Sequence, residues 1–212
     1  REERTKRELD LPLGAERAQN FVDPATGEQA APSLSERDAI TRGFRFATAK
    51  QRYELGDLEQ VKTIVRQIDD LTAKLITART PTEAVLQFGQ LQAGAFTRAN
   101  PVAAAYADSK QAFLGVLSRN LGGERGVLTD RDINRISRSL VGFGDTVDVR
   151  TLKTAIVGQL MGIAVAAKHR TIFGQPIPKD TKTGLSTLID QLESASAVPT
   201  PSGFRDVPRR RP

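Results

Sequence analysis

The stretch LEQVKTIVRQIDDLTAKLITAR, residues 58–79, decides the fold class. Its apolar residues recur at intervals of three and four, which is the period of one helix face. Asp57 stands immediately before it as the expected N-cap. The pattern therefore predicts a long amphipathic helix with a seam like that of a coiled coil. The seam consists of Leu58, Val61, Val65, Ile68 and Leu75, with Thr72 in the remaining place, and Ile64, Leu71 and Ile76 widen it.

Helix start signals recur along the rest of the chain. Ser35 with Asp38 three residues later is a capping-box variant, and we expect this helix to end at Gly56. Thr80 followed by Pro81 is an N-cap with proline at the first helical position. Hydrophobic residues make up 39% of the chain and aromatic residues only 5%, so we expect an aliphatic core. An aliphatic, alanine-rich composition favours helix over sheet. The sequence predicts six or seven helices in an all-α, irregular helical bundle. Further caps are expected at Asn100, Thr129 and Asp145.

Prolines, glycines and charges divide the 212 residues into three regions. Residues 1–34 are interrupted so often that we expect an extended arm or linker. Residues 35–197 form the predicted helical domain. Residues 198–212, VPTPSGFRDVPRRRP, hold four prolines and are expected to be a disordered basic tail. The interruptions in the first region are Pro12, Gly14, Pro24, Gly27 and Pro32.

A second long helix is expected at about residues 146–170. Its centre, AIVGQLMGIAVAA, is apolar nearly all round, which is typical of a central helix or an oligomer interface. Gly158 and Gly162 form a GxxxG pair that allows close helix approach. Thirteen apolar residues are too few to span a bilayer, so we expect no transmembrane segment. Together with Val61, Val65, Ile68 and Leu75, the two glycines are the predicted protein-interface residues.

The chemical motifs in the chain are incomplete. Asp130, Asp132 and Asn134 have the first spacings of an EF-hand loop, but Arg135 stands where glycine belongs and Val141 where glutamate belongs. We therefore interpret the acidic residues as helix caps. The chain has no cysteine and a single histidine, which excludes disulfides and multi-histidine metal sites within one chain. We expect no cofactor, no metal and no enzymatic activity. The histidine, His169, is interpreted as a helix-end residue rather than a general base.

The net charge of +6 leaves a nucleic-acid-binding role open. Arg131, Arg135 and Arg138 are spaced to share one side of a helix and could touch phosphate groups. The tail adds a second basic group, and such contacts weaken steeply with salt because counterions are released. The alternative function is thus a non-specific nucleic-acid-binding module. Its tail residues are Arg209, Arg210 and Arg211.

Three stretches carry a family resemblance. They are FVDPATGEQAAPS (21–33), LITARTPTEA (75–84) and YADSKQAFLGVLSRNLGGERGVLTDRDINRI (106–136). With them, roughly residues 20–170 resemble a helical segment of tailed-bacteriophage virion proteins, among them podophage DNA-ejection components. The most specific part is the element GGERGVLTDRDI, followed by a helix and GDT.

The resemblance implies a structural role in the virion. We expect an internal, ejected or tail-associated protein that assembles with copies of itself and with other virion proteins through apolar helix faces. Through its basic residues, the chain could also make non-specific contact with packaged DNA. Members of this family are not characterised by catalytic residues in this segment, which agrees with the incomplete motifs.

Overall fold

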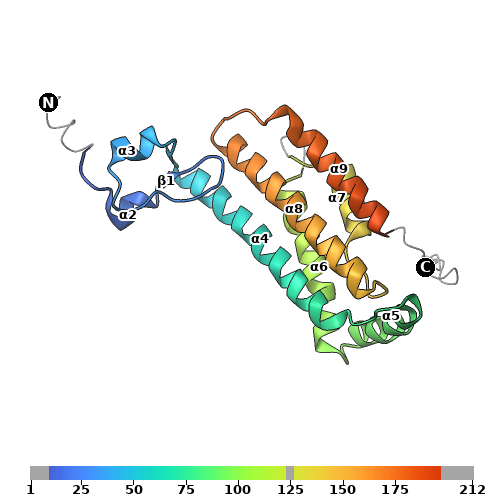
Figure 1. The fold of residues 1–212 in the computed structure, drawn as a ribbon. Helices are drawn as coiled ribbons and strands as arrows, with labels where there is room; N and C mark the ends of the chain where they lie inside the picture. The colour runs from blue at the N-terminus through green and yellow to red at the C-terminus, as the bar shows by residue number, and fades with distance from the viewer. Residues whose placement is uncertain (1–9, 123–126, 197–212) are drawn as a thin grey trace, which may run out of the picture.

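The computed structural model describes residues 10–122 and 127–196. This part is all-α, as the sequence predicts, with eight helices and one small two-stranded antiparallel sheet (Figure 1). The predicted tail at 198–212 lies outside the described residues, as do residues 1–9 and 123–126. In chain order the elements are α2 (Gly14–Ala18), β1 (Phe21–Val22), α3 (Glu36–Thr41), β2 (Arg45–Phe46), α4 (Ala49–Leu75), α5 (Pro81–Phe96), α6 (Pro101–Asn120), α7 (Asp130–Ser139), α8 (Val147–Ile172) and α9 (Lys179–Ser196).

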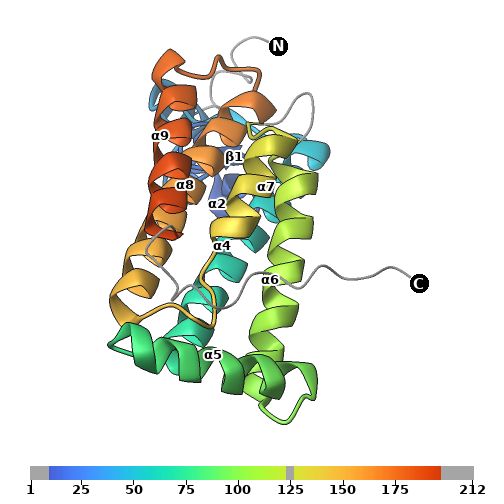
Figure 2. The ribbon, with the colours of Figure 1, turned by 90° about the vertical axis from the view of Figure 1, so that its right-hand side faces the viewer.

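The long helix α4 forms one side of the bundle. It packs against α6 and α8, while α9 packs against both α7 and α8. The helix α5 contacts α6 and lies across one end of the bundle (Figures 1 and 2).

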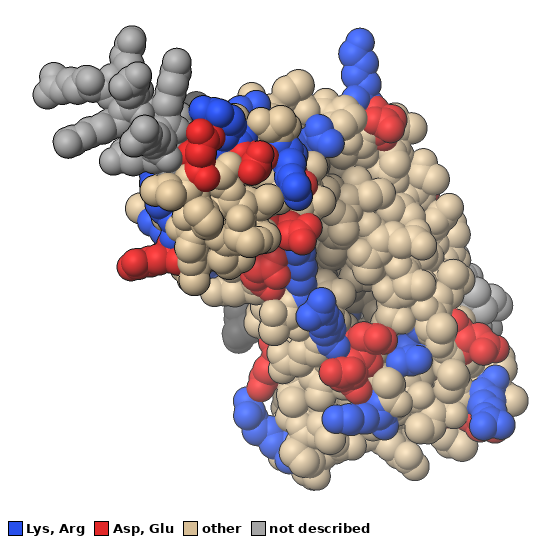
Figure 3. Space-filling view, turned by 60° about the vertical axis from the view of Figure 1, so that its left-hand side comes forward, with Lys and Arg blue, Asp and Glu red and all other residues tan. Residues whose placement is uncertain are grey.

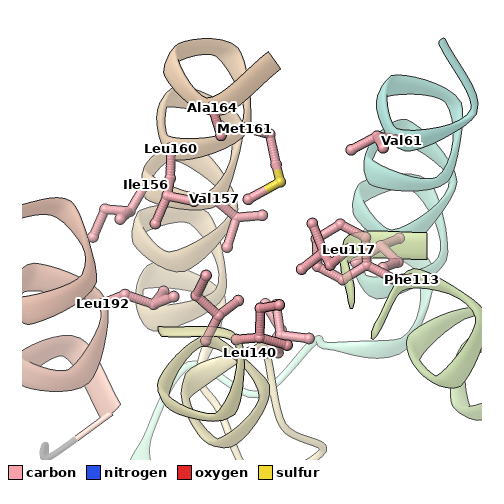
Figure 4. Packing of buried hydrophobic residues seen from close by; sticks show 14 of the residues in the cluster. Val61, Phe113, Leu117, Leu140, Ile156, Val157, Leu160, Met161, Ala164 and Leu192 are labelled. Atoms are coloured by element: carbon pink, nitrogen blue, oxygen red, sulfur yellow. The ribbon is translucent and has the colours of Figure 1, made fainter. Parts of the chain in front are cut away.

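The core is aliphatic and lies between α4, α6 and α8. Val61 of α4, Leu117 of α6 and Leu160 of α8 are fully buried. Figure 4 shows Val61, Leu117 and Met161 pointing into the same interior. Each fully buried aliphatic side chain of this size contributes about 1.5–3 kcal/mol of transfer free energy. The stripe predicted from residues 58–79 is therefore the face that α4 contributes to this core.

The start of α4 differs from the prediction. Thr48, not Asp57, is the N-cap, because its hydroxyl and the side chain of Gln51 form a reciprocal capping box. Gly56 does not end a helix but lies inside α4, where glycine costs about 1 kcal/mol relative to alanine. The preceding helix ends earlier, at Thr41, before Gly43 turns the chain with a φ of +95°.

Residues 10–47 fold into a small unit that we call the N-terminal lobe. Its strands pair antiparallel, with Phe21 opposite Phe46. This differs from the extended arm predicted for residues 1–34, because the prolines and glycines there make turns that fold the chain back on itself. The turn at residues 23–27 is closed by the Gly27 N–H, which donates to the Asp23 carbonyl at 2.8 Å. The lobe has its own buried cluster: Leu13, Ala18, Phe21, Ala30 and Ala39, with Leu34 and Phe44 beside it.

The remaining predicted caps are confirmed with one exception. Asn100 and Thr129 cap α6 and α7 through their side chains, and Thr80 caps α5 ahead of a first-turn proline. The cap of α8 is Thr146 instead of Asp145. The Asp145 carboxylate accepts from the Gly142 N–H at 2.7 Å, so it organises the loop before the helix.

Candidate functional site

The predicted interface seam on α4 lies inside the chain. Val61, Ile68 and Leu75 are buried against α6 and α8, and Val65 is half-buried. The prediction that these residues bind a partner chain therefore needs correction. An apolar stripe predicts that one face of a helix is buried. Its period does not show whether the covering helix belongs to the same chain or to another chain.

The two glycines of the predicted interface behave differently. Gly158 and Gly162 are exposed on α8, and a Cβ added to either would meet no described atom within 4 Å. No charged residue occurs in residues 154–167. Charged side chains run down the middle of the view in Figure 3, and the surface beside them, on the side where α8 lies, shows no blue or red atoms over a broad area. We call this surface the uncharged α8 face; its exposed residues are Leu152, Ala155, Gly158, Gln159 and Gly162.

The helix α8 is also longer than its apolar centre suggested. It has 26 residues, and among the described helices it alone is long and apolar enough to cross a membrane by length and composition. The core helix of a folded domain meets the same criterion. Here α8 packs against α4 and α9 and buries nine residues, Lys153 and His169 among them.

The arginines of α7 line an open groove between α7 and α9. Arg135 is held there by Glu193, at 2.7 and 2.9 Å, and by Asp190. The hydrogen bonds that Arg135 donates to these two carboxylates raise the pKa of Arg135, and the bonds to Glu193 lower the pKa of that carboxyl. Arg131 and Arg138 are exposed in the same groove. The structure thus brings the three predicted arginines together but neutralises the middle one. Arg209, Arg210 and Arg211 lie outside the described residues.

The acidic cluster before α7 is a helix cap, as interpreted from the sequence. The Thr129 hydroxyl accepts from the Asp132 N–H, and the Asp132 carboxylate accepts from the Thr129 N–H at 3.0 Å. Asp130 occupies the first turn, where a negative charge suits the helix dipole. Across residues 10–122 and 127–196, no group of three or more His, Asp or Glu side chains is placed to hold a metal ion.

His169 lies in the last turn of α8 but is not a surface residue. It is 2% exposed, and it lies beneath Gly27 of the N-terminal lobe. Its Nδ1 has no hydrogen-bond partner among the described residues. Burial, and then the charge of Lys62, lowers the pKa of His169. The ring borders a small pocket between the lobe and α4, with Arg52 and Glu59 on its wall.

The sequence patterns did not predict a buried polar network at the end of the bundle that α5 crosses. Lys153 of α8 is 4% exposed on its side chain, and its ammonium lies 2.9 Å from the Asp145 carboxylate. The Tyr106 hydroxyl donates to the Val141 carbonyl, and burial raises its pKa. Burial also lowers the pKa of Lys110, with the charge of Lys153 as the second cause. The sequence feature that could have indicated this network is Lys153, a charged residue beside the apolar centre of α8.

Gln87 of α5 joins two loops through one side chain. Its Oε1 accepts from the N–H groups of Thr77 and Ala78, at 2.8 and 2.9 Å. Its Nε2 donates to the carbonyls of Phe143 and Asp145, at 2.8 and 3.2 Å. This buried amide therefore fixes α5 relative to the α7–α8 loop.

Comparison with known proteins adds no relative. No protein-family model, no curated protein and no solved structure matches this chain.

Proposed function

We propose that this chain is a structural component of a bacteriophage particle, an internal, ejected or tail-associated virion protein. The resemblance of residues 20–170 to tailed-phage virion proteins supports this role. The observation that carries the proposal is the uncharged α8 face, whose exposed residues lie between positions 152 and 162 of a 26-residue helix. In this proposal neighbouring virion proteins dock there.

The chemistry of this face suits a helix of another protein. Gly158 and Gly162 lack side chains at its centre, so a second backbone can approach closely. No charge has to be desolvated along residues 154–167, and desolvated charges are what most disfavour an apolar contact. Leu152, 52% exposed, supplies an apolar anchor at one end.

Incorporation into virions tests the proposal. Gly158→Lys and Gly162→Lys place a charge on the face, and because a Cβ at either position meets no described atom within 4 Å, we expect the fold to be retained. Gly115→Lys is the matched control, because Gly115 is an exposed helical glycine of α6 with open space around it. Mass spectrometry of purified virions should find the wild-type and control chains and much less of the two variants.

The same experiment on emptied particles separates the subtypes. A chain present in full virions and lost from emptied ones is ejected with the genome, whereas a retained chain is a fixed tail or connector part. If the wild-type chain is missing from virions, or if the α8 variants enter as readily as the control, the proposal is wrong.

A second candidate is non-specific nucleic-acid binding through the α7 groove. Arg131 and Arg138 favour it because both are exposed and point into one open groove. Arg135 contributes little, because Glu193 and Asp190 already neutralise it. In a gel-shift assay at two salt concentrations, Arg131→Ala with Arg138→Ala should weaken binding and reduce its salt dependence. Unchanged binding by that double variant would eliminate this candidate.

A further inference from the structure

The outward side of α5 is apolar and uncovered. Phe96 is 90% exposed and Leu86 is 67% exposed, the most exposed large apolar side chains of the helices in the described chain apart from Tyr53. Gly89 and Ala93 lie between them and are also exposed. A single charged residue, Glu83, occurs in the whole helix. An apolar helix of this kind is expected in a core, yet only Ala84 and Gln87 are buried.

The order of these residues is symmetric. Leu86, Gly89, Ala93 and Phe96 are separated by three, four and three positions, so they follow one side of the helix. Large side chains stand at the two ends of this stripe and small ones stand in the middle. A helix of the same sequence laid antiparallel on it repeats the same arrangement when the two-fold axis passes at the level of residue 91.

We propose that this stripe binds the α5 stripe of a second copy of this chain, antiparallel and about a two-fold axis. Leu86 of each copy then lies opposite Phe96 of the other, and Gly89 lies opposite Ala93. The small central residues let the two backbones approach closely, and the large end residues cover each other. This is an isologous contact, in which one surface is its own complement.

The charges at the ends of the stripe agree with the antiparallel direction. Glu83 precedes the stripe and Arg98 follows it, and both are exposed. In the antiparallel pair Glu83 of one copy lies next to Arg98 of the other, at both ends of the contact. In a parallel pair each residue would meet its own like charge. The existing ion pair of Arg98 with Asp108, at 3.7 Å and on exposed side chains, is too weak to prevent this.

The inner side of α5 fixes the stripe in place. Gln87 bonds four backbone groups of two loops, so the outward side points in a defined direction before any partner binds. A contact made by one 16-residue helix from each copy is small beside the interfaces of stable complexes, which bury about 1,200–2,000 Å² in total. The dimer is therefore expected to be reversible, with a dissociation constant in the micromolar range. This inference uses a different surface from the α8 face and does not depend on the virion role.

Sedimentation of the full chain over a range of concentrations tests the inference. The wild-type chain should change from monomer to dimer with concentration. Gly89→Glu should raise the dimer dissociation constant about tenfold or more, because the contact would bury unpaired carboxylates. A Cβ at Gly89 meets no described atom within 4 Å, so the monomer folds normally. Gly115→Glu, the matched change on α6, should leave the dimer unaffected.

Cross-linking tests the direction of the pair independently. The chain has no cysteine, so Leu86→Cys and Phe96→Cys chains each carry one thiol. Mixed and oxidised, they should form a heterodisulfide, whereas each alone should not, because identical positions stand about 15 Å apart along the axis. A chain that stays monomeric at every concentration, equal effects of Gly89→Glu and Gly115→Glu, or Leu86→Cys chains that link to themselves would overturn the inference.

Discussion

Replacing Gly27 by alanine should release the N-terminal lobe from the bundle. Gly27 has a φ of +76° and lies directly over the His169 ring. A Cβ there would overlap the ring carbon Cε1 and lie 2.9 Å from Nδ1. His169 is buried and cannot swing out of the way without opening the contact between the lobe and α8.

Two terms set the size of the effect. An alanine held at positive φ costs about 1–2 kcal/mol. Forcing an extra carbon into a filled site adds about 1–3 kcal/mol. The sum is about 2–5 kcal/mol. Gly14→Ala isolates the first term, because Gly14 has a φ of +70° in the same lobe and a Cβ there meets no described atom within 4 Å.

Urea unfolding and amide exchange measure both terms. Gly27→Ala should lose more stability than Gly14→Ala by about 1–3 kcal/mol, the overpacking term. His169→Ala should cancel that difference in a double-mutant cycle. If the lobe opens alone, the Ala30 N–H, which donates to the Phe21 carbonyl, should exchange faster. Equal losses for the two alanine variants, or no coupling to His169, would show that the ring contact is not what the structure indicates.

Three further perturbations have defined outcomes. In the folded chain the pKa of His169 is lowered below 6.5, so below that pH the unfolded chain binds more protons than the folded chain. The free energy of unfolding should therefore fall as the pH drops from 6.5, by up to about 1.4 kcal/mol for each pH unit. His169→Gln should remove that component from urea titrations, and an unchanged pH slope would contradict it. Lys153→Met leaves the largely buried Asp145 carboxylate without its cation and should lower the free energy of unfolding by about 3–5 kcal/mol. Adding Asp145→Asn should restore part of that loss. If the double variant recovers no stability, the ion pair does not contribute as the structure indicates. Thr129→Ala removes the capping box shared with Asp132 and should cost about 1 kcal/mol in thermal unfolding, and an unaltered midpoint would count against the cap.

Local chemistry made the helices predictable. Thr80 before Pro81, Asn100 before α6 and Thr129 before α7 are caps whose effect needs only neighbouring residues. The stripe on α4 was predictable for the same reason, because its period is a property of one segment. The caps at Asp57 and Asp145 were wrong because another residue, Thr48 or Thr146, offered a hydroxyl at a better position.

Contacts between distant segments were not predictable. Whether Val61 faces a helix of its own chain depends on how α6 and α8 return to α4, which no local pattern records. The burial of His169 depends on Gly27, which precedes it by more than one hundred residues. The N-terminal lobe was missed because Phe21 finds its partner strand only after a second helix. Of the predicted interface, only the glycines of α8 remain on the surface.

We expect the loops that the Gln87 amide joins, at the α5 end of the bundle, to unfold as one unit. Two connections more than fifty residues apart in the chain share this side chain, and removing it leaves two N–H and two C=O groups without their partners together. Neither connection is therefore expected to open alone, because opening either one breaks hydrogen bonds of the same Gln87 amide. In hydrogen exchange the Ala78 and Val147 amides should report a single opening rate, as members of one foldon, although no sheet or continuous helix links them.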